Sequence, residues 1–302
     1  MLDVCLLGTG GTMPLKNRWL TSAIFRSNGK TLMIDCGEGT QIAMKFAGFT
    51  FKPLGVLCIT HFHADHLSGL PGMLLSMGNE GREEPLTIIG PKGVERVVNA
   101  LRVIAPGLPF DIKFIEIINP EEPIELDGFI ITPFRVRHTV ECLGYKIELK
   151  RAGKFDVEKA LKNGVPKKIW SLLQKNDVVE LDGKAYTKDM VLGEERKGIK
   201  VVYATDTRPV QSIVRNAQNA DLLICEGMYG DAEKLKRAEE TCHMMMYEAA
   251  ELAKEANVRE LWLTHYSPSM EHPKEYINTA LKIFPKTKAC NDGEKITISF
   301  EN

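Results

Sequence analysis

The sequence has no long apolar run and no strong excess of charge of either sign. None of its apolar stretches approaches the roughly 18 residues that a membrane span needs, so we expect no transmembrane segment. Residues 1–5 lack a basic segment followed by a long apolar one, and we expect no secretion signal. The formal net charge is −1, so any contact with nucleic acid must come from a local basic patch.

The seven cysteines include no C-x-x-C pair, and their number is odd. Several lie within apolar, strand-like runs, as expected of buried free thiols. Because disulfides are rare in reducing compartments, this pattern predicts a cytoplasmic protein. The chain is 302 residues long, 44% hydrophobic and 26% charged, which is an ordinary globular composition with enough apolar material for a core.

Short apolar runs alternate along the chain with segments of helical periodicity. Strands are predicted at residues 2–7, 22–26, 31–35, 56–59, 86–89, 112–118, 129–136, 144–149, 200–204, 221–225 and 260–263, near residue 287, and at 295–300. Helices are predicted at residues 39–46, 67–77, 93–104, 210–216, 245–256 and 276–283. Strand-rich and strand–helix segments alternate through both halves, which predicts an α/β (α+β) fold, a sandwich of sheets with helices outside.

A polar segment at residues 150–199 interrupts this alternation, with many Lys, Glu and Asp and only scattered apolar residues. We expect a single domain over residues 1–302, in which this segment is either a projecting arm or a solvated surface insertion. A run of charges is more often a solvated face than a binding site. Five of its basic side chains are nevertheless candidates for contact with RNA phosphates: Lys150, Arg151, Lys154, Lys167 and Lys168.

Three histidines and a carboxylate follow the apolar run at residues 56–59. The order is His61-Phe62-His63-Ala64-Asp65-His66. A strand end followed by a loop can direct several side chains at one point, and imidazole and carboxylate groups suit zinc. The alternative is a set of solvated loop histidines. Three of the seven histidines of the chain lie in this short cluster, however, which favours a metal site.

Further candidate ligands follow three other predicted strands: His138, Asp206 and His265. Each alone would be interpreted as a surface or hydrogen-bonded residue, but their shared placement indicates convergence on one edge of the sheets. Seven ligands exceed the four that one tetrahedral zinc takes, and they suffice for two ions that share a carboxylate. Two metals about 3.5–4 Å apart suit hydrolysis of a phosphodiester or a similar ester bond.

The H-x-H-x-D-H cluster, together with the three later ligands, resembles the metallo-β-lactamase superfamily, and the whole chain most resembles its ribonuclease Z family. The segments that carry the resemblance are residues 8–11 with Pro14 and Arg18, residues 35–41 (Asp-Cys-Gly-Glu-Gly-Thr-Gln), residues 70–74 and residues 206–209. The resemblance implies a four-layer αββα sandwich with two zinc ions per subunit, although other divalent ions are possible. It implies one ion on His61, His63 and His138, the other on Asp65, His66 and His265, and Asp206 between them.

The same resemblance implies an endoribonuclease that removes 3′ trailers from precursor tRNA, leaves a 3′-hydroxyl on the tRNA and works as a homodimer. Asp65 would orient the attacking hydroxide as general base. His243, oriented by Glu226, would protonate the leaving oxygen. The alternative for His243 is that it caps the helix that follows.

Some segments depart from the family pattern. Residues 225–228 are Cys-Glu-Gly-Met where the family has His-Glu-Ala-Thr, and residues 243–245 are His-Met-Met where it has His-Ser-Thr. In the insertion, residues 165–170 replace a Pro-Gly-Pro segment of the arm that grips tRNA. These departures support a second hypothesis, a hydrolase of the same fold that acts on small phosphodiesters or lactones. Residues 35–41 and the retained insertion favour the ribonuclease.

Overall fold

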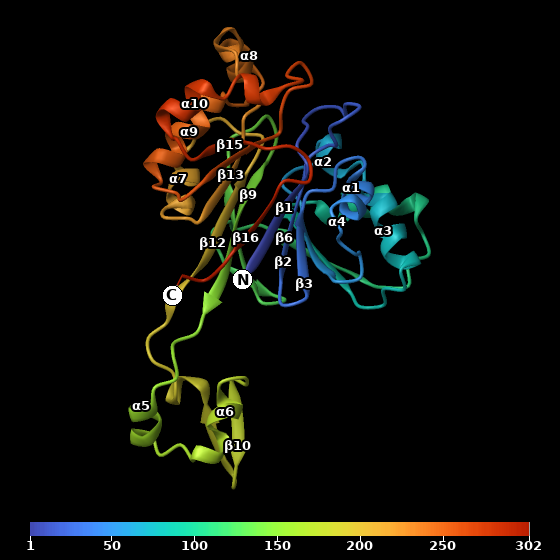
Figure 1. Ribbon diagram of the computed structural model, residues 1–302. Coiled ribbons are helices and arrows are strands. Elements are labelled where there is room, and N and C mark those ends of the chain that lie inside the picture. Colours follow the sequence, from blue (N-terminus) through green and yellow to red (C-terminus); the bar gives the residue numbers. More distant parts are fainter. Residues whose placement is uncertain (302) are drawn as a thin grey trace. The chain divides into compact units, whose positions relative to one another are not determined.

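Two seven-stranded sheets form most of the computed structural model, which describes residues 1–301 (Figure 1). The first sheet has the order β16-β1-β2-β3-β4-β5-β6. Its strands are β1 (Leu2–Gly8), β2 (Ser22–Ser27), β3 (Lys30–Ile34), β4 (Leu54–Cys58), β5 (Leu86–Pro91), β6 (Ile112–Ile117) and β16 (Lys295–Ile298). Strands β3 to β6 pair in parallel, whereas β16, β1, β2 and β3 pair antiparallel.

The second sheet has the order β15-β14-β13-β12-β9-β8-β7. Its strands are β7 (Ile124–Leu126), β8 (Phe129–Arg135), β9 (Leu143–Arg151), β12 (Arg196–Ala204), β13 (Leu222–Glu226), β14 (Leu261–Thr264) and β15 (Thr287–Ala289). Strands β12 to β15 are parallel. Because parallel strands end at the same edge, their following loops gather at one place.

Helices cover the outer face of each sheet (Figure 1). The helices on the first sheet are α1 (Thr40–Phe46), α2 (Ala64–Leu67), α3 (Leu70–Asn79) and α4 (Val94–Leu101). Those on the second sheet are α7 (Gln211–Ala217), α9 (Met246–Glu255) and α10 (Asn278–Ile283). Helix α8 (Leu235–Glu240) precedes α9 in the chain. Cys5 and Leu7 of β1 share a buried cluster with Met44 of α1 and Leu74 of α3. The predicted four-layer αββα sandwich is therefore confirmed.

The inner faces of the sheets form the middle of the sandwich. Val4 and Leu6 alternate along β1 with the residues that face the helices, and both are buried. Two hydrogen bonds join β9 to the segment after β4: the Tyr145 hydroxyl donates to the Ile59 carbonyl at 2.6 Å, and the Leu143 N–H donates to the Thr60 carbonyl at 3.0 Å. They fix the second sheet beside the start of the histidine cluster.

Residues 150–199, together with Phe300 and Glu301, form a second compact unit. The sequence predicted no elements here, but the structure contains α5 (Val157–Lys162), α6 (Trp170–Leu173), β10 (Val178–Leu181) and β11 (Lys184–Thr187). The scattered apolar residues of the segment come together as a small core of its own: Ala160, Val165, Ile169, Leu173, Tyr186 and Val191. The segment is therefore folded rather than an extended loop.

Two predicted helices are wrong in their extent. Residues 67–77 were expected to be continuous, but α2 ends at Leu67 and α3 begins at Leu70. The N–H of Gly69 donates to the Cys36 carbonyl at 3.0 Å, and a Cβ on Gly69 would lie 2.1 Å from the Gly37 carbonyl oxygen. This close approach of the loop after β3 interrupts the helix. The helix predicted at residues 93–104 is also shorter, because Arg102–Ile104 forms a 3₁₀ turn.

Three hairpins share one turn chemistry. The pairs Asn28-Gly29, Asp127-Gly128 and Asp182-Gly183 each link two paired strands and have positive φ at both residues. This is the conformation of a type I′ turn, which Asn-Gly and Asp-Gly favour. Only the first hairpin was predicted, so the Asp-Gly pairs are the signal that could have revealed β7, β10 and β11.

Within residues 1–301, no helix combines the length and apolarity that crossing a membrane requires.

Candidate metal centre

The candidate ligands all lie just beyond strand ends of the larger unit. His61 and His63 follow β4, and the short helix α2 carries Asp65 and His66. His138 lies between β8 and β9, Asp206 follows β12, and His265 follows β14. Asp206 and His265 have φ of 50° and 56°. Asp and His adopt this left-handed conformation more readily than most residues other than glycine, and here it turns the chain sharply after each strand.

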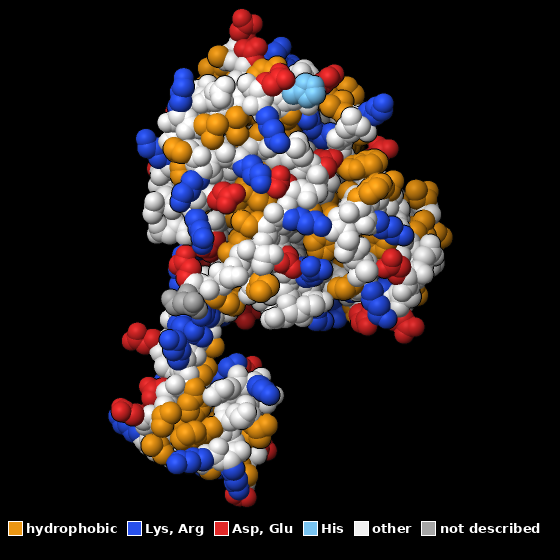
Figure 2. All heavy atoms as spheres, in the orientation of Figure 1, with side chains coloured by type: hydrophobic (Ala, Val, Ile, Leu, Met, Phe, Trp, Pro, Cys, Tyr) orange, Lys and Arg blue, Asp and Glu red, His pale blue; other side chains and the backbone are white. Residues whose placement is uncertain are grey.

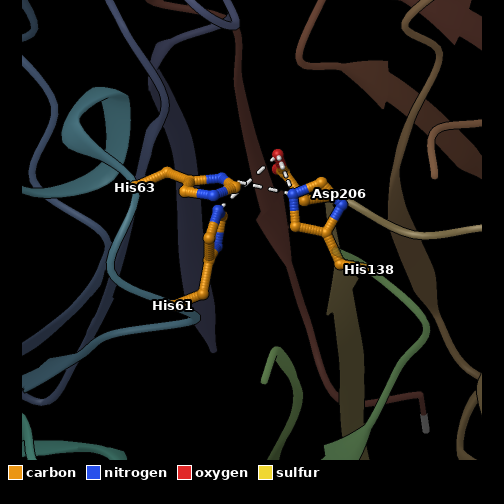
Figure 3. A group of neighbouring side chains, drawn as sticks. All are labelled: His61, His63, His138 and Asp206. Atoms are coloured by element: carbon orange, nitrogen blue, oxygen red, sulfur yellow. Dashed lines mark hydrogen bonds and ion pairs between the residues drawn. The ribbon is translucent and has the colours of Figure 1, made fainter. Parts of the chain in front are cut away.

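The seven side chains converge on two overlapping groups. The first contains His61, His63, His138 and Asp206, and the second contains Asp65, His66, Asp206 and His265. Within each group the potential ligand atoms all lie within 4.8 Å of one another. Figure 3 shows His61 and His63 facing His138 and Asp206 from the opposite side. The structure therefore brings together all seven of the predicted ligands.

The carboxylate of Asp206 belongs to both groups, with one oxygen toward each. Its Oδ1 lies 3.2 Å from His66 Nε2 and 3.1 Å from His265 Nε2. Its Oδ2 lies 3.8 Å from both His61 Nε2 and His138 Nε2. This is the arrangement of a carboxylate that can bridge two cations.

Unsatisfied polar atoms show that the site fits a metal. Nε2 of His61, His66 and His265, and Oδ1 of Asp206, are buried and have no hydrogen-bond partner among the described residues. Buried polar atoms without partners are rare, and each requires an explanation. Nitrogen and carboxylate donors directed at a common point are the ligands of zinc and related divalent ions. The residues present therefore fit a divalent metal ion.

The electrostatics of the centre also favour a cation. Burial lowers the pKa of His61 to about 2, so this imidazole is neutral and has a lone pair to offer. Burial opposes a charge on His66 too, but the carboxylates of Asp206 and Asp35 hold its pKa well above the ordinary value. Burial likewise opposes the charge on Asp206, yet His265 and His66 hold its pKa well below the usual range. The buried carboxylates therefore require positive charge beside them.

Asp35, which was not among the predicted site residues, holds the ring of His66. Its Oδ2 lies 2.8 Å from His66 Nδ1, and its Oδ1 accepts a hydrogen bond from the Thr60 N–H at 2.8 Å. A carboxylate on the second ring nitrogen fixes the tautomer of a metal-binding histidine and directs the other nitrogen at the metal. Residues 35–41 were recognised only as a family motif; the pairing with His66 is a contact between distant segments.

Glu226 and His243 form a buried pair beside the two groups. Glu226 Oε2 lies 3.1 Å from His243 Nδ1 and accepts a hydrogen bond from the Met244 N–H at 3.0 Å, and the Thr207 N–H donates to Oε1. Burial opposes a charge on His243, but Glu226 raises its pKa to about 9. The N-cap of α9 is Met245 and not His243, so the capping alternative for His243 is wrong.

An open cavity of about 430 Å³ gives access to this centre. Its lining includes His63, Asp65, His138, Asp206, His243 and His265, together with Thr12, Ala64, Thr139, Glu240 and Thr241. No lysine or arginine is part of this lining. A second depression, lined by Lys30, Lys52, Arg82 and Lys113 among others, contains none of the predicted ligands.

Other charged and polar residues lie outside the centre. Arg208 forms an ion pair with Glu248 at 2.5 Å. His272 is exposed at the start of a 3₁₀ turn. The five basic candidates for RNA contact belong to the smaller unit, where Arg151 is half-buried and the other four are exposed: Lys150, Lys154, Lys167 and Lys168.

Comparison with known proteins agrees with this architecture. Residues 2–152 match a family model described as anti-Pycsar protein Apyc1, and residues 190–266 match the beta-lactamase superfamily domain. The short form of human tRNase Z aligns with a TM-score of 0.71 at 22% identity, covering 99% of this chain and 100% of that one. The metallo-beta-lactamase fold protein YhfI from Bacillus subtilis aligns with a TM-score of 0.70 at 21% identity, covering 98% of each chain. Fold and site together define a metal-dependent hydrolase of the metallo-β-lactamase superfamily.

Full-length relatives narrow this class. Ribonuclease Z of Lachnoclostridium phytofermentans is 57% identical over 301 residues, covering 100% of this chain and 99% of the relative. Ribonuclease Z of Lachnospira eligens is 57% identical with the same coverage, and that of Clostridium acetobutylicum is 47% identical with 100% of both chains covered. The chain belongs to the ribonuclease Z family, and it is an endoribonuclease that hydrolyses phosphodiester bonds. The resemblance seen in the sequence is thereby confirmed.

Replacing Asp35 with Asn tests the support of His66. Asn tolerates the positive φ of 58° at this position, so the substitution isolates the carboxylate. We expect metal affinity to fall about 10- to 100-fold, as for other partners of metal-binding histidines. Competition with a chromophoric chelator measures the affinity, and Asp3→Asn, in a surface pair with Arg26, is the control. Equal affinity in Asp35→Asn and wild type would contradict this role of Asp35.

Proposed function

We propose that this protein removes the 3′ trailer of precursor tRNA by hydrolysis and leaves a 3′-hydroxyl on the tRNA. The observation that carries the proposal is that two kinds of groups lie at one cavity. Six candidate metal ligands surround a seventh, the Asp206 carboxylate, and His243, paired with Glu226, lines the same cavity. Phosphodiester hydrolysis needs both, because it must stabilise charge on the phosphate and also protonate the leaving oxygen.

The proposed cofactor is a pair of zinc ions. His61, His63 and His138 would hold one ion, Asp65, His66 and His265 the other, and Asp206 would bridge them. The support is the division of the seven residues into two groups, with one Asp206 oxygen facing each. When bound, such ions stabilise charge on the phosphate and lower the pKa of water.

Asp65 and His243 would move the protons of the reaction. One oxygen of Asp65, Oδ2, accepts a hydrogen bond from the Thr12 N–H at 2.7 Å. The other can accept a hydrogen bond from the attacking water, orient it toward phosphorus and take up the proton that the water loses. As the water oxygen bonds to phosphorus, the bond from phosphorus to the tRNA 3′-oxygen would break. His243, held at Nδ1 by Glu226, would donate the proton from Nε2 that makes this oxygen a hydroxyl.

The smaller unit is the proposed site of tRNA contact. Its exposed lysines include Lys167 and Lys168 at the start of a 3₁₀ turn, next to the half-buried ring of Trp170. Lys168 also lies 3.5 Å from Asp182 on the surface. On the face shown in Figure 2, Lys and Arg are interspersed with Asp and Glu, so the unit presents local basic groups rather than a continuous basic field.

The proposed assembly is a homodimer. Ile42 and Phe46 lie one turn apart on α1 and are 44% and 82% exposed, and Leu75 on the adjacent α3 is 41% exposed. Exposed apolar side chains on adjacent helices favour contact with another chain. Analytical ultracentrifugation measures the mass in solution directly. A monomer at micromolar concentration would contradict this proposal without affecting the proposed chemistry.

Cleavage of a precursor tRNA with a 3′ trailer tests the proposed function. We expect the end-labelled RNA to yield a tRNA with a 3′-hydroxyl and a trailer with a 5′-phosphate. A chelator should abolish cleavage and added zinc or manganese should restore it, whereas Asp65→Ala should stay inactive with metal present. Cleavage of small phosphodiesters without any cleavage of the precursor would contradict the proposal.

Leaving-group dependence tests the role of His243. His243→Ala should lower kcat on precursor tRNA by about 10²- to 10⁴-fold, because the alkoxide that leaves requires a proton. The same variant should lose far less activity on a p-nitrophenyl phosphodiester, whose phenolate leaves without protonation. His272→Ala, which removes an exposed histidine outside the site, is the control. Equal losses on both substrates would contradict the role of a general acid.

Salt dependence tests the role of the smaller unit. Lys167→Ala combined with Lys168→Ala should raise KM for precursor tRNA and leave hydrolysis of a small phosphodiester unchanged. The slope of log affinity against log salt should become shallower by about one for each lost phosphate contact. Lys52→Ala, an exposed lysine of the larger unit, is the matched control. An unchanged KM and slope would remove these lysines from the RNA-binding surface.

A further inference from the structure

Asp292, in the loop between β15 and β16, is a half-buried carboxylate that does not belong to the ligand set. Its Oδ1 accepts hydrogen bonds from the Thr9 N–H at 2.9 Å and from the Thr9 hydroxyl at 2.7 Å. Its Oδ2 accepts a hydrogen bond from the Trp19 N–H at 2.5 Å. The Asp292 carboxylate, near the C-terminal end of the sequence, thus binds both ends of the loop at residues 9–19, near its N-terminal end. We call these three residues the Asp292 clamp.

The clamped loop continues directly into the metal centre. The N–H of Gly11 donates to the Tyr266 carbonyl at 3.0 Å, and the N–H of Tyr266 donates to the Thr9 carbonyl at 2.9 Å. A Cβ on Gly11 would lie 2.6 Å from Cε1 of His265, so the backbone there packs against this imidazole. The loop therefore lies against one of the proposed ligands along its first residues.

The next residue, Thr12, reaches the other side of the same ligand group. Its N–H donates to Asp65 Oδ2 at 2.7 Å. Its φ is 69°, in the left-handed region that is unfavourable for a β-branched residue. Such a conformation persists only where the surrounding structure determines it. The hydrogen bonds of Thr9 and Gly11 supply that restraint within three residues of Thr12.

We propose that Asp292 is a positioning residue, which holds Asp65 and His265 in the geometry for metal binding and catalysis by fixing the loop at residues 9–12. The inference deepens the proposed function and rests on it for the role of Asp65. The hydrogen bonds of the Asp292 carboxylate go to Thr9 and Trp19 and to none of the proposed ligands. Asp292 acts through Thr9 on the segment that contacts Asp65 and His265.

Asp292→Asn tests this inference with almost no change in size. Both oxygens of Asp292 accept hydrogen bonds from N–H groups, whereas an amide has only one acceptor oxygen. In Asp292→Asn the NH₂ group must therefore face the N–H of either Thr9 or Trp19, and that hydrogen bond is lost. The loop should shift, and kcat should fall about 10- to 100-fold with KM little changed, as for other residues that orient metal ligands. Thr9→Val removes one hydrogen bond and should act in the same direction, whereas Thr9→Ser keeps the hydroxyl and should restore activity. Glu294→Gln, which removes an exposed ion pair with Lys288 from the same loop, should match wild type.

A second measurement does not depend on activity. Metal affinity by chelator competition should fall about 10- to 100-fold in Asp292→Asn, while the metal-free variant still unfolds cooperatively on heating. If melting temperature falls but kcat and metal affinity match wild type, Asp292 only stabilises the fold and the proposal is overturned. Inactivity of the wild type on precursor tRNA would refute the proposed function, whereas the affinity comparison would still decide the role of Asp292.

Discussion

The carboxylate of Asp206 lies where the two groups of ligands meet, and the rest of the site is arranged around it. It is almost completely buried, and its two oxygens face different sets of imidazoles. A buried carboxylate without compensating charge is strongly unfavourable. The buried Nε2 atoms of His61, His66 and His265 have no hydrogen-bond partner among the described residues, and nitrogen atoms of this kind bind divalent cations. A divalent metal centre satisfies both requirements.

The αββα sandwich brings the candidate metal ligands together at one place. Strands β4, β12, β13 and β14 end at one edge of the sheets, so short loops bring together residues that are far apart in sequence. Asp206 and His265 both adopt left-handed conformations there, and so does Asp35 at the end of β3. The chain turns sharply at each of these residues, and the last residues of the strand before each of them are buried. The sheets therefore set the positions of these side chains, and the turns set their directions.

Residues with a local signature could be predicted from the sequence. The histidine cluster, the later ligands and most strands follow from apolar runs and from what comes directly after them, and the structure confirms the αββα fold. The break at Gly69 could not be predicted, because its cause is the carbonyl of Gly37 in another segment. The same is true of Asp35, Thr12 and Asp292, whose partners lie far away along the chain. The core of the smaller unit was missed for a different reason, since its apolar residues have no regular period in a charged segment.

The position of metal relative to Asp206 is the most direct test of this account. Crystals of the metal-loaded protein, measured at the zinc absorption edge, give an anomalous difference map that locates each ion without reference to the protein atoms. We predict two peaks, one on each side of the Asp206 carboxylate, the first among His61, His63 and His138 and the second among Asp65, His66 and His265. A single peak, or peaks away from Asp206, would contradict a shared carboxylate as the centre of the site.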